Sequence, residues 1–213
     1  MNNTVYYVIN EKNKKVNYSE QKGAMIMQGY FAIITIVLLV IMISFRVFLL
    51  HKMGIKAIKF GEIDKKDFII IPFILIFFYL LFSSTLNLPK VGTELFSNEV
   101  ASWIGVVLCM IGLLLFLLSL ISFGKSFRVG IDEEKPGALI TTGIFAISRN
   151  PIYVAFGSIL FGIFLILPNW ILLLYLIAGF WLFNRQVLRE EDSLKRIYGN
   201  EYVEYCKKVL RYL

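Results

Sequence analysis

The sequence predicts an all-α integral membrane protein with about five transmembrane helices, of which the last two form a helical hairpin. Hydrophobic residues make up 58% of the 213 residues and the mean hydropathy is +0.71, whereas soluble domains have roughly 45 to 50% apolar residues. Only 17% of the residues are charged, and they gather between long apolar runs. Such runs must be satisfied by lipid or by one another.

Three long apolar runs occupy the N-terminal part of the chain. They extend over residues 28–50, 68–88 and 101–123, and the last two are followed by Pro89 and Gly124. Each run has close to the ~20 residues that a helix needs to cross the hydrocarbon. We therefore expect three transmembrane helices in this part of the chain.

The fourth and fifth helices are expected in one apolar run over residues 152–183, which is interrupted at Pro168 and Asn169. Proline lacks the N–H that a helix interior needs and clashes with the preceding turn, so this pair predicts a tight turn. Each arm is short for a full span at ~1.5 Å per residue. Residues 184–189 could extend the second arm.

The C-terminal tail is expected to be helical. Gly199 and Asn200 interrupt two helical stretches, as a helix end followed by a new helix start would. Apolar and aromatic residues then recur at spacings of three and four, at Tyr202, Tyr205, Val209 and Tyr212. This pattern predicts an amphipathic helix that either lies in the membrane interface or packs back over the helix ends.

The distribution of Lys and Arg predicts the orientation. Positive residues in short loops favour the cytoplasm, and most of them follow the first span, lie between residues 125 and 150, or lie in the tail from Arg185 onward. The N-terminus is therefore expected outside and the C-terminus, with its amphipathic helix, in the cytoplasm, with the protein in the cell membrane. The first 27 residues are polar, and no cleaved signal peptide is expected.

The chain is expected to form one structural unit in two parts. Residues 1–100 would provide an N-terminal tail and the first two transmembrane helices, and residues 101–213 a C-terminal membrane core. The polar segment over residues 125–150 is long and rich in Gly and charge, and it lies between hydrophobic elements, as a site-forming loop would. A candidate ligand site is therefore expected in the second part.

Several classes of function are excluded. His51 is the only histidine, and Cys109 and Cys206 are the only cysteines, so neither a metal site nor a disulfide framework is expected. The net charge of +7 comes from Lys and Arg that flank apolar spans, which indicates topology signals and lipid-headgroup contacts rather than nucleic-acid binding. The glycine-rich motifs of soluble nucleotide-binding folds do not occur, and nothing in the sequence specifies an oligomeric state.

The first of two clusters that could carry chemistry is L-I-T-T-G-I-F-A-I-S-R-N-P-I-Y over residues 139–153. In it, Arg149, Asn150 and Pro151 suit a helix start, with Asn150 at the N-cap and Pro151 at the first helical position. The free N–H groups of such a start, beside Arg149, could also receive an anionic ligand. Phe145 and Tyr153 are either membrane-interface aromatics or residues that stack on a ligand.

The second cluster begins at Arg185 and continues to Tyr205, and the five-helix topology brings it to the same membrane face. Glu190 and Glu191 follow the last apolar arm, and the simplest interpretation is a solvated pair that ends the span. Alternatively, Glu190 could bind an ammonium or a ribose hydroxyl, while Arg185 and Arg189 offer donors to a carboxylate or phosphate. Opposite charges at short spacing suit a zwitterionic ligand.

In this order, with a hydrophobic hairpin between them, the two clusters resemble the isoprenylcysteine carboxyl methyltransferase family and its phospholipid methyltransferase relatives. The resemblance covers residues 123–211 and is carried by L-I-T-T-G-I-F, R-N-P-I-Y, E-E-D-S-L and Y-G-N-E-Y-V-E-Y. It implies a membrane-embedded enzyme that uses S-adenosylmethionine. A lipophilic or prenylated acceptor would enter from the bilayer, and the reaction would O-methylate a carboxylate.

The resemblance also implies roles for particular residues. Arg185 would meet the acceptor, and Arg185 and Tyr153 are the candidate catalytic residues. Glu190 matches the glutamate that holds the cofactor. The full set expected to line the cofactor is Gly137, Ala138, Leu139, Ile140, Phe145, Asn150, Pro151, Ile152, Tyr153, Glu190 and Glu191.

Two positions depart from the family pattern. Asn150 stands where the eukaryotic enzymes have His before Pro, and Phe145 lacks the hydroxyl of the usual Tyr. An amide hydrogen-bonds but cannot accept a proton as an imidazole does. A carboxylate acceptor needs no base, so O-methylation of a preformed anion is favoured.

Other functions remain open at this stage. A phospholipid or other lipid amine could be the acceptor, which would make the reaction an N-methylation. The chain could instead be a membrane reductase like the steroid reductases, with a nicotinamide cofactor, or a non-enzymatic membrane scaffold in which both clusters only cap helices. A transporter is less favoured because no ionisable residue lies near the centre of a predicted span.

Overall fold

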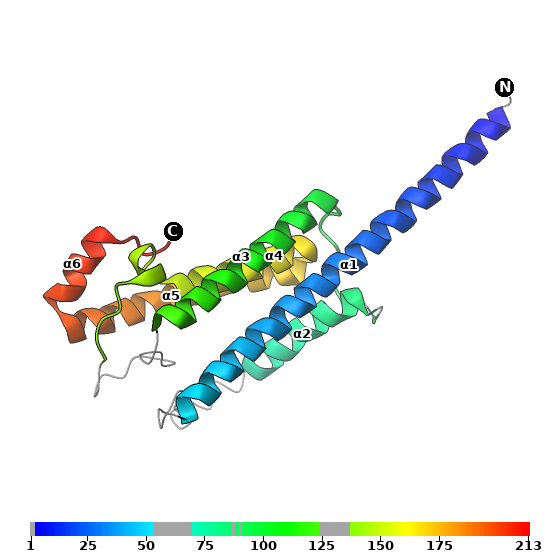
Figure 1. Cartoon of the computed structure of the whole chain (residues 1–213). Coiled ribbons are helices and arrows are strands. Elements are labelled where there is room, and N and C mark those ends of the chain that lie inside the picture. The colour runs from blue at the N-terminus through cyan, green and yellow to red at the C-terminus, as the bar shows by residue number, and fades with distance from the viewer. Residues whose placement is uncertain (1–2, 53–69, 87, 90, 124–136) are drawn as a thin grey trace.

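The computed structural model describes residues 3–52, 70–86, 88–89, 91–123 and 137–213 (Figure 1). Every regular element of these residues is a helix. The helices are α1 (Asn3–Lys52), α2 (Ile70–Thr85), α3 (Glu99–Phe123), the 3-10 helix η3 (Gly143–Ala146), α4 (Pro151–Ile166), α5 (Trp170–Tyr198) and α6 (Asn200–Lys208). The predicted all-α fold is confirmed. Parts of the expected second span, the basic loop after the first span and the 125–150 loop lie outside the described residues.

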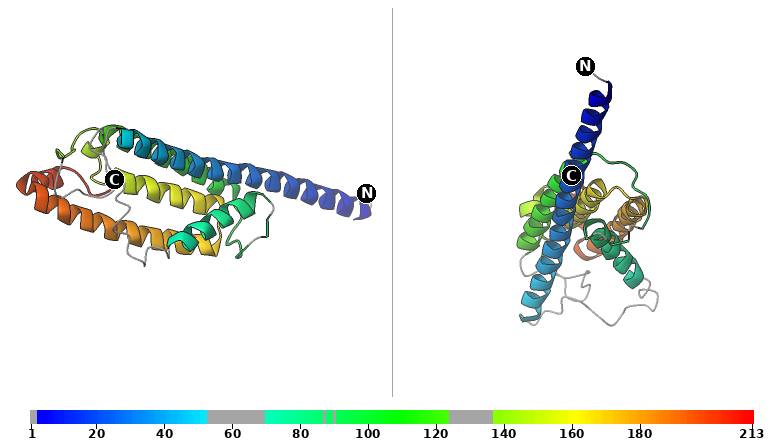
Figure 2. Two further views of the ribbon diagram at one scale, coloured as in Figure 1. Left: turned by 90° about the horizontal axis from the view of Figure 1, so that it is seen from below. Right: turned by 90° about the vertical axis from the view of Figure 1, so that its right-hand side faces the viewer.

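Helix α1 is longer than expected. It has 50 residues, which at ~1.5 Å per residue makes it about 75 Å long, and its N-terminal part extends beyond the other helices (Figures 1 and 2). Residues 3–27, which belong to the segment expected as a polar tail, thus continue the helix that forms the first span. Lys, Glu and Gln are good helix formers, so a polar composition does not end a helix.

Helices α3 and α4 form the tightest contact of the bundle. A Cβ atom on Gly105 would lie 2.5 Å from the carbonyl oxygen of Gly162, and one on Gly112 would lie 2.8 Å from the carbonyl oxygen of Ala155. Ser158 donates a hydrogen bond across the pair to the carbonyl oxygen of Leu108 at 2.8 Å. Small residues let two backbones approach in a membrane, so this pair forms the centre of the core.

The hairpin predicted at Pro168 and Asn169 is present between α4 and α5. The side chain of Asn169 accepts a hydrogen bond from the N–H of Ile171 at 2.8 Å and therefore caps α5. Its amide also donates to the carbonyl oxygen of Val91 at 2.8 Å, and the N–H of Leu95 donates to the carbonyl oxygen of Pro168 at 2.7 Å. The turn is thereby tied to the segment that precedes α3.

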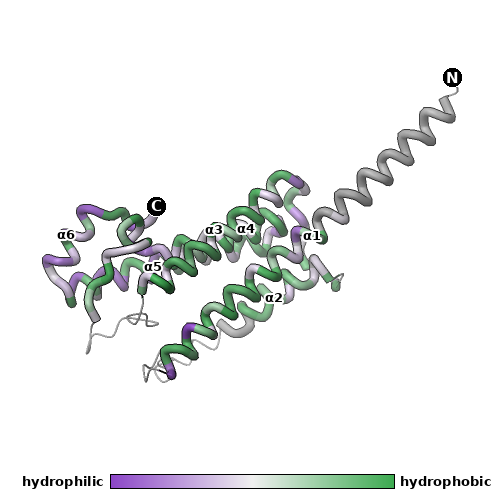
Figure 3. Tube along the Cα trace, viewed as in Figure 1, coloured by the Kyte–Doolittle hydropathy of each residue, from purple (hydrophilic) through white to green (hydrophobic). Residues whose placement is uncertain are grey.

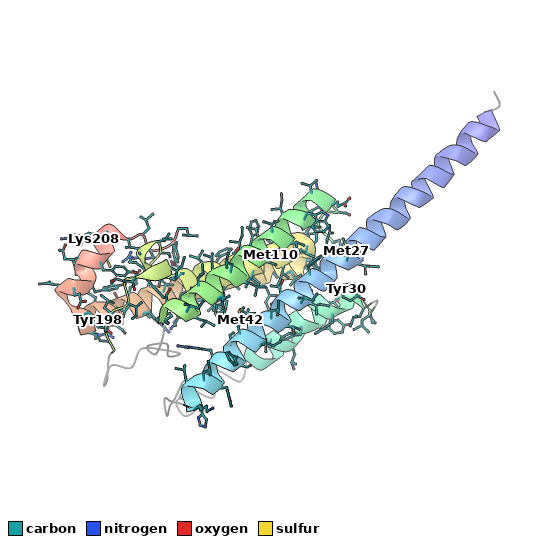
Figure 4. All side chains as sticks on the ribbon, in the orientation of Figure 1. Met27, Tyr30, Met42, Met110, Tyr198 and Lys208 are labelled. Atoms are coloured by element: carbon teal, nitrogen blue, oxygen red, sulfur yellow. The ribbon has the colours of Figure 1, made fainter. Side chains whose placement is uncertain are left out.

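Within the part of the chain that the structure describes, three helices are long and apolar enough to cross a membrane: Ile26–Lys52, Glu99–Phe123 and Trp170–Tyr198. The apolar segments Ile74–Ser83 in α2 and Pro151–Ile166 in α4 are shorter. Of the five expected spans, three therefore have full length. Large hydrophobic side chains such as Met110 on α3 (Figure 4), 63% exposed, point away from the core, as lipid-facing residues do. The chain is an integral membrane protein.

Candidate functional site

Polar residues gather at one end of the molecule, in α6 and the adjoining part of α5, whereas α3 and α4 are largely hydrophobic (Figure 3). After α6 the chain turns back as an extended segment over residues 209–213, which we call the strap. It lies parallel to the segment before α4, with a bridge between Ser148 and Leu210 and a 2.9 Å hydrogen bond from the N–H of Arg149 to the carbonyl oxygen of Leu210. The two sequence clusters therefore meet.

Asn150 occupies the expected N-cap position of α4, and Pro151 is at the helix start. However, the Asn150 side chain does not cap the helix. Its amide nitrogen donates to Oε1 of Glu191 and to the carbonyl oxygen of Arg211, both at 3.1 Å. Asn150 is therefore the N-cap residue by position, as predicted, but its side chain binds the buried carboxylate of Glu191 instead of the first N–H groups of α4.

Glu191 is buried, with 8% of its surface exposed. Arg211 contacts Oε2 of Glu191 through both Nε and a terminal nitrogen, each at 2.9 Å. A terminal nitrogen of Arg149 lies 3.4 Å from Oε1. The hydrogen bond to Glu191 raises the pKa of Arg211 above its usual value. The solvated interpretation of the glutamate pair is therefore wrong for Glu191, whose two oxygens are both occupied by partners.

Glu190 has a different environment from its neighbour. Its Oε1 accepts a hydrogen bond from the Tyr153 hydroxyl at 2.6 Å and another from the Gln186 amide at 3.0 Å. Among the residues that the structure describes, its Oε2 has no hydrogen-bond partner, and the side chain is only half-buried. Glu190 thus combines a fixed position with one oxygen open to a ligand.

The arginines of α5 lie on its exposed surface. The guanidinium carbon of Arg185 lies 5.5 Å from the ring centroid of Trp181, a cation–π distance. Arg189 is exposed as well. In this conformation Arg185 stands on the exposed surface of α5 beside Trp181 rather than in contact with Tyr153 and Glu190.

The expected cofactor segment at Gly137 to Ile140 approaches α5. The Tyr198 hydroxyl donates to the carbonyl oxygen of Gly137 at 2.6 Å. Phe145, by contrast, is a buried packing residue: its ring lies edge-on to Phe123 with centroids 4.5 Å apart. Its carbonyl oxygen accepts from the Tyr205 hydroxyl at 2.6 Å.

The aromatic stripe of the tail packs back onto the helix ends, one of the two expected arrangements. Tyr202 and Tyr205 are buried on α6, and burial is the main cause that raises the pKa of Tyr205 to about 12. The stripe does not continue along one helix, however. The chain becomes extended at Val209, and the Tyr212 hydroxyl instead reaches Oδ1 of Asn184 at 2.9 Å.

The expected site residues divide into a buried set and an accessible set. Those buried in the structure are Phe145, Asn150, Pro151 and Glu191. Those half-buried or exposed are Gly137, Ala138, Leu139, Ile140, Ile152, Tyr153, Arg185 and Glu190. Sequence reasoning missed Arg211, Gln186 and Asn184, for which the only available signal was a polar or charged residue within the 123–211 region of resemblance.

Comparison with known proteins adds to this geometry. The sequence model of the phospholipid methyltransferase family matches residues 100–201. The protein-S-isoprenylcysteine O-methyltransferase of Xenopus laevis is 31% identical over 111 residues, which are 51% of this chain and 38% of the relative. A probable enzyme of the same name from Oryza sativa subsp. indica is 31% identical over 51% of this chain and 58% of its own length. The C-terminal half of the chain is therefore similar in sequence to protein-S-isoprenylcysteine O-methyltransferases.

The same family is found among solved structures. A structure described as the eukaryotic intramembrane Ras methyltransferase, isoprenylcysteine carboxyl methyltransferase, matches with a TM-score of 0.55 at 22% identity, over 77% of this chain and 58% of that one. At this identity the match shows a shared fold. The chain spans between 38% and 58% of the length of the two curated methyltransferases above, and the family resemblance predicted from the motifs is confirmed.

Proposed function

We propose that the protein is an S-adenosylmethionine-dependent membrane methyltransferase that O-methylates a carboxylate of a lipophilic, isoprenylcysteine-like acceptor. The observation that carries the proposal is the environment of Glu190. Its carboxylate is held by Tyr153 and Gln186 and has an oxygen without a partner among the described residues. The family relation of residues 100–201 supports the reaction class.

The residues present suit the polar groups of the proposed cofactor. When bound, S-adenosylmethionine supplies a methyl group on a positively charged sulfur. The open oxygen of Glu190 suits its ammonium or ribose hydroxyls, and the backbone of Gly137 to Ile140 provides a wall that Tyr198 ties to α5. The cavity between Leu115, Ser148 and Leu213 is too small to admit a water molecule, and so it cannot hold a ligand of cofactor size. We therefore expect the cofactor to bind on the exposed surface formed by Gly137 to Ile140.

The acceptor class follows from the residue at position 150, whose side-chain amide cannot serve as a base. Both hydrogens of the Asn150 amide are donated, and an amide cannot take up a proton. A carboxylate acceptor is already an anion at neutral pH, so its oxygen can form the new bond to carbon without losing a proton. We infer that Arg185, exposed on α5 beside Trp181, pairs with this carboxylate and positions it.

A lipid amine is a second candidate acceptor, because the family model that matches residues 100–201 is that of the phospholipid methyltransferases. A primary amine is protonated at neutral pH and must lose a proton before it can attack. Glu190 is the nearest described carboxylate that could accept one. Reaction with an amine acceptor would therefore depend on Glu190 in two ways: for binding the cofactor and for deprotonating the amine. Reaction with a carboxylate acceptor would need only the first.

We further propose that the site faces the cytoplasm, with the N-terminus outside, in the cell membrane. The positive residues that flank the spans support this orientation. An enzyme reporter that works only outside the cytoplasm, fused to the C-terminus, is expected to be inactive. An active C-terminal fusion would contradict the orientation.

The first test is binding of S-adenosylmethionine to the purified protein in nanodiscs by calorimetry. Native protein is expected to bind, and Glu190→Gln to bind at least about tenfold more weakly, since a charged hydrogen bond is lost. Asp192→Asn is the matched control because Asp192 is exposed on the same helix and is expected to bind as native. No binding by the native protein would overturn the proposal.

The acceptor is tested next, with cofactor carrying a labelled methyl group. A farnesylated cysteine with a free carboxylate and phosphatidylethanolamine represent the two acceptor classes. Label in the prenylcysteine ester supports the leading proposal, whereas label in the lipid amine supports the second candidate. Binding and stabilisation by a nicotinamide cofactor instead would favour a reductase.

A further inference from the structure

The second half of α5 is attached to the rest of the protein mainly by polar contacts. Four residues of this helix are buried, and beyond Leu176 these are only Val187 and Glu191. They are four residues apart and therefore lie on one face of the helix. Because the buried face is so narrow, hydrophobic packing does little to fix the rotation of this half of α5 about its own axis.

The strap adds a second attachment to the direct contacts that Asn150 and Arg149 make with Glu191. Arg211 places two nitrogens on Oε2 of Glu191, each at 2.9 Å, and Tyr212 donates to Asn184 at 2.9 Å. Asn184 and Glu191 are seven residues apart, which is two helical turns along the same face. Because the carbonyl oxygen of Arg211 also accepts from Asn150, the strap connects α5 directly to the start of α4.

We propose that Arg211 is a positioning residue for Glu190. Successive residues of a helix point about 100° apart, so fixing Glu191 against the start of α4 also fixes the direction of Glu190. In that direction the carboxylate of Glu190 meets the hydroxyl of Tyr153 on α4. Arg211 thereby determines where the ligand-binding carboxylate stands, although it does not itself contact Glu190.

Arginine suits this role better than lysine does. The guanidinium of Arg211 presents two nitrogens to one carboxylate oxygen of Glu191. At the same time, the backbone carbonyl oxygen of Arg211 accepts a hydrogen bond from the Asn150 amide. Lysine carries a single charged nitrogen without the planar fork. Arg211→Lys is therefore expected to retain the charge but only part of the orientation. Its binding of S-adenosylmethionine should lie between that of the native protein and that of Arg211→Gln.

The structural part of the inference is tested without any ligand. Hydrogen–deuterium exchange of the whole chain in nanodiscs is expected to become faster in the second half of α5 in Arg211→Gln and to stay unchanged in α3. Lys208→Gln is the matched control, because Lys208 is an exposed cation at the end of α6 (Figure 4) with no ion pair among the described residues. Unchanged exchange in α5 of Arg211→Gln would overturn the inference.

The functional part rests on the proposed function and is tested by a double-mutant cycle on S-adenosylmethionine binding. Arg211→Gln alone is expected to weaken binding by about tenfold. In the Glu190→Gln background the same change is expected to have no further effect, because the residue through which it acts is already gone. Additive losses would show a general structural defect and overturn the positioning role.

The two measurements separate the two proposals. If the native protein does not bind S-adenosylmethionine, the proposed function fails, while the exchange experiment still decides whether Arg211 holds α5. If the native protein binds but the cycle is additive, the proposed function stands and the positioning role fails. Partial recovery of binding by Arg211→Lys relative to Arg211→Gln is the result expected of an oriented contact.

Discussion

Gly105 of α3 and Gly162 of α4 face each other so closely that a Cβ atom on either would lie within 2.6 Å of the carbonyl oxygen of the other. The contact is between backbones, which cannot rotate away as a side chain can. We expect Gly105→Ala and Gly162→Ala each to destabilise the protein by about 1–3 kcal/mol, the usual cost of overpacking. Thermal unfolding in detergent measures this, with Gly23→Ala as the control, because a Cβ atom there meets nothing within 4 Å.

The two glutamates are expected to differ in what they do for the protein. Removing the charge of Glu191 leaves Arg149 and Arg211 without their buried partner. Glu191→Gln should therefore cost about 3 kcal/mol of stability, the low end for a broken buried pair, since the Arg211 side chain is 41% exposed. Glu190→Gln should melt close to native and lose ligand binding. An equal effect of both changes on the melting temperature would contradict this division.

Stability should fall at alkaline pH in a way that depends on Tyr205. Burial raises the pKa of this phenol from 10.0 to about 12, and the hydroxyl donates to Phe145. A group whose pKa is raised in the folded state contributes its full stability below the unfolded pKa and loses it as the pH rises through the folded pKa. The melting-temperature advantage of native protein over Tyr205→Phe should therefore shrink between about pH 10 and 12. An advantage that stays constant over this range would refute the prediction.

The hairpin turn should depend on both functions of Asn169. Asn169→Ala removes the cap of α5 and the hydrogen bond to Val91, with an expected cost of about 1–2 kcal/mol. Asn169→Asp keeps the acceptor for the cap and loses only the donor. Its melting temperature should therefore lie between those of the native protein and Asn169→Ala. Melting of the three proteins in the same detergent gives the order.

Features that depend on a few neighbouring residues were predictable. Pro168 and Asn169 marked the hairpin because proline and an N-capping residue act locally, and Pro151 marked the start of α4 for the same reason. The long extension of α1 was missed because its polar residues are compatible with helix. Hydropathy alone cannot distinguish a tail from a helix that leaves the membrane.

The roles of the individual site residues were less predictable, because they depend on the rotation of α5 and on the reversal of the chain after α6. The adjacent carboxylates of Glu190 and Glu191 are equivalent in sequence. They differ because Arg211 of the strap, together with Asn150 and Arg149, contacts Glu191, whereas Tyr153 and Gln186 contact Glu190. Phe145 likewise becomes a packing residue only because α6 folds back over it and Tyr205 reaches its carbonyl oxygen.

The hydrogen bond between Asn150 and the carbonyl oxygen of Arg211 joins residues 61 positions apart. At ~5–20 residues per second, a ribosome needs roughly 3–12 s to make the chain between them. Until Arg211 has been made, Arg149, Asn150 and Glu191 lack the residue that closes their network. A nascent chain released before Arg211 would thus be unassembled at its polar end, a species that quality-control proteases can recognise.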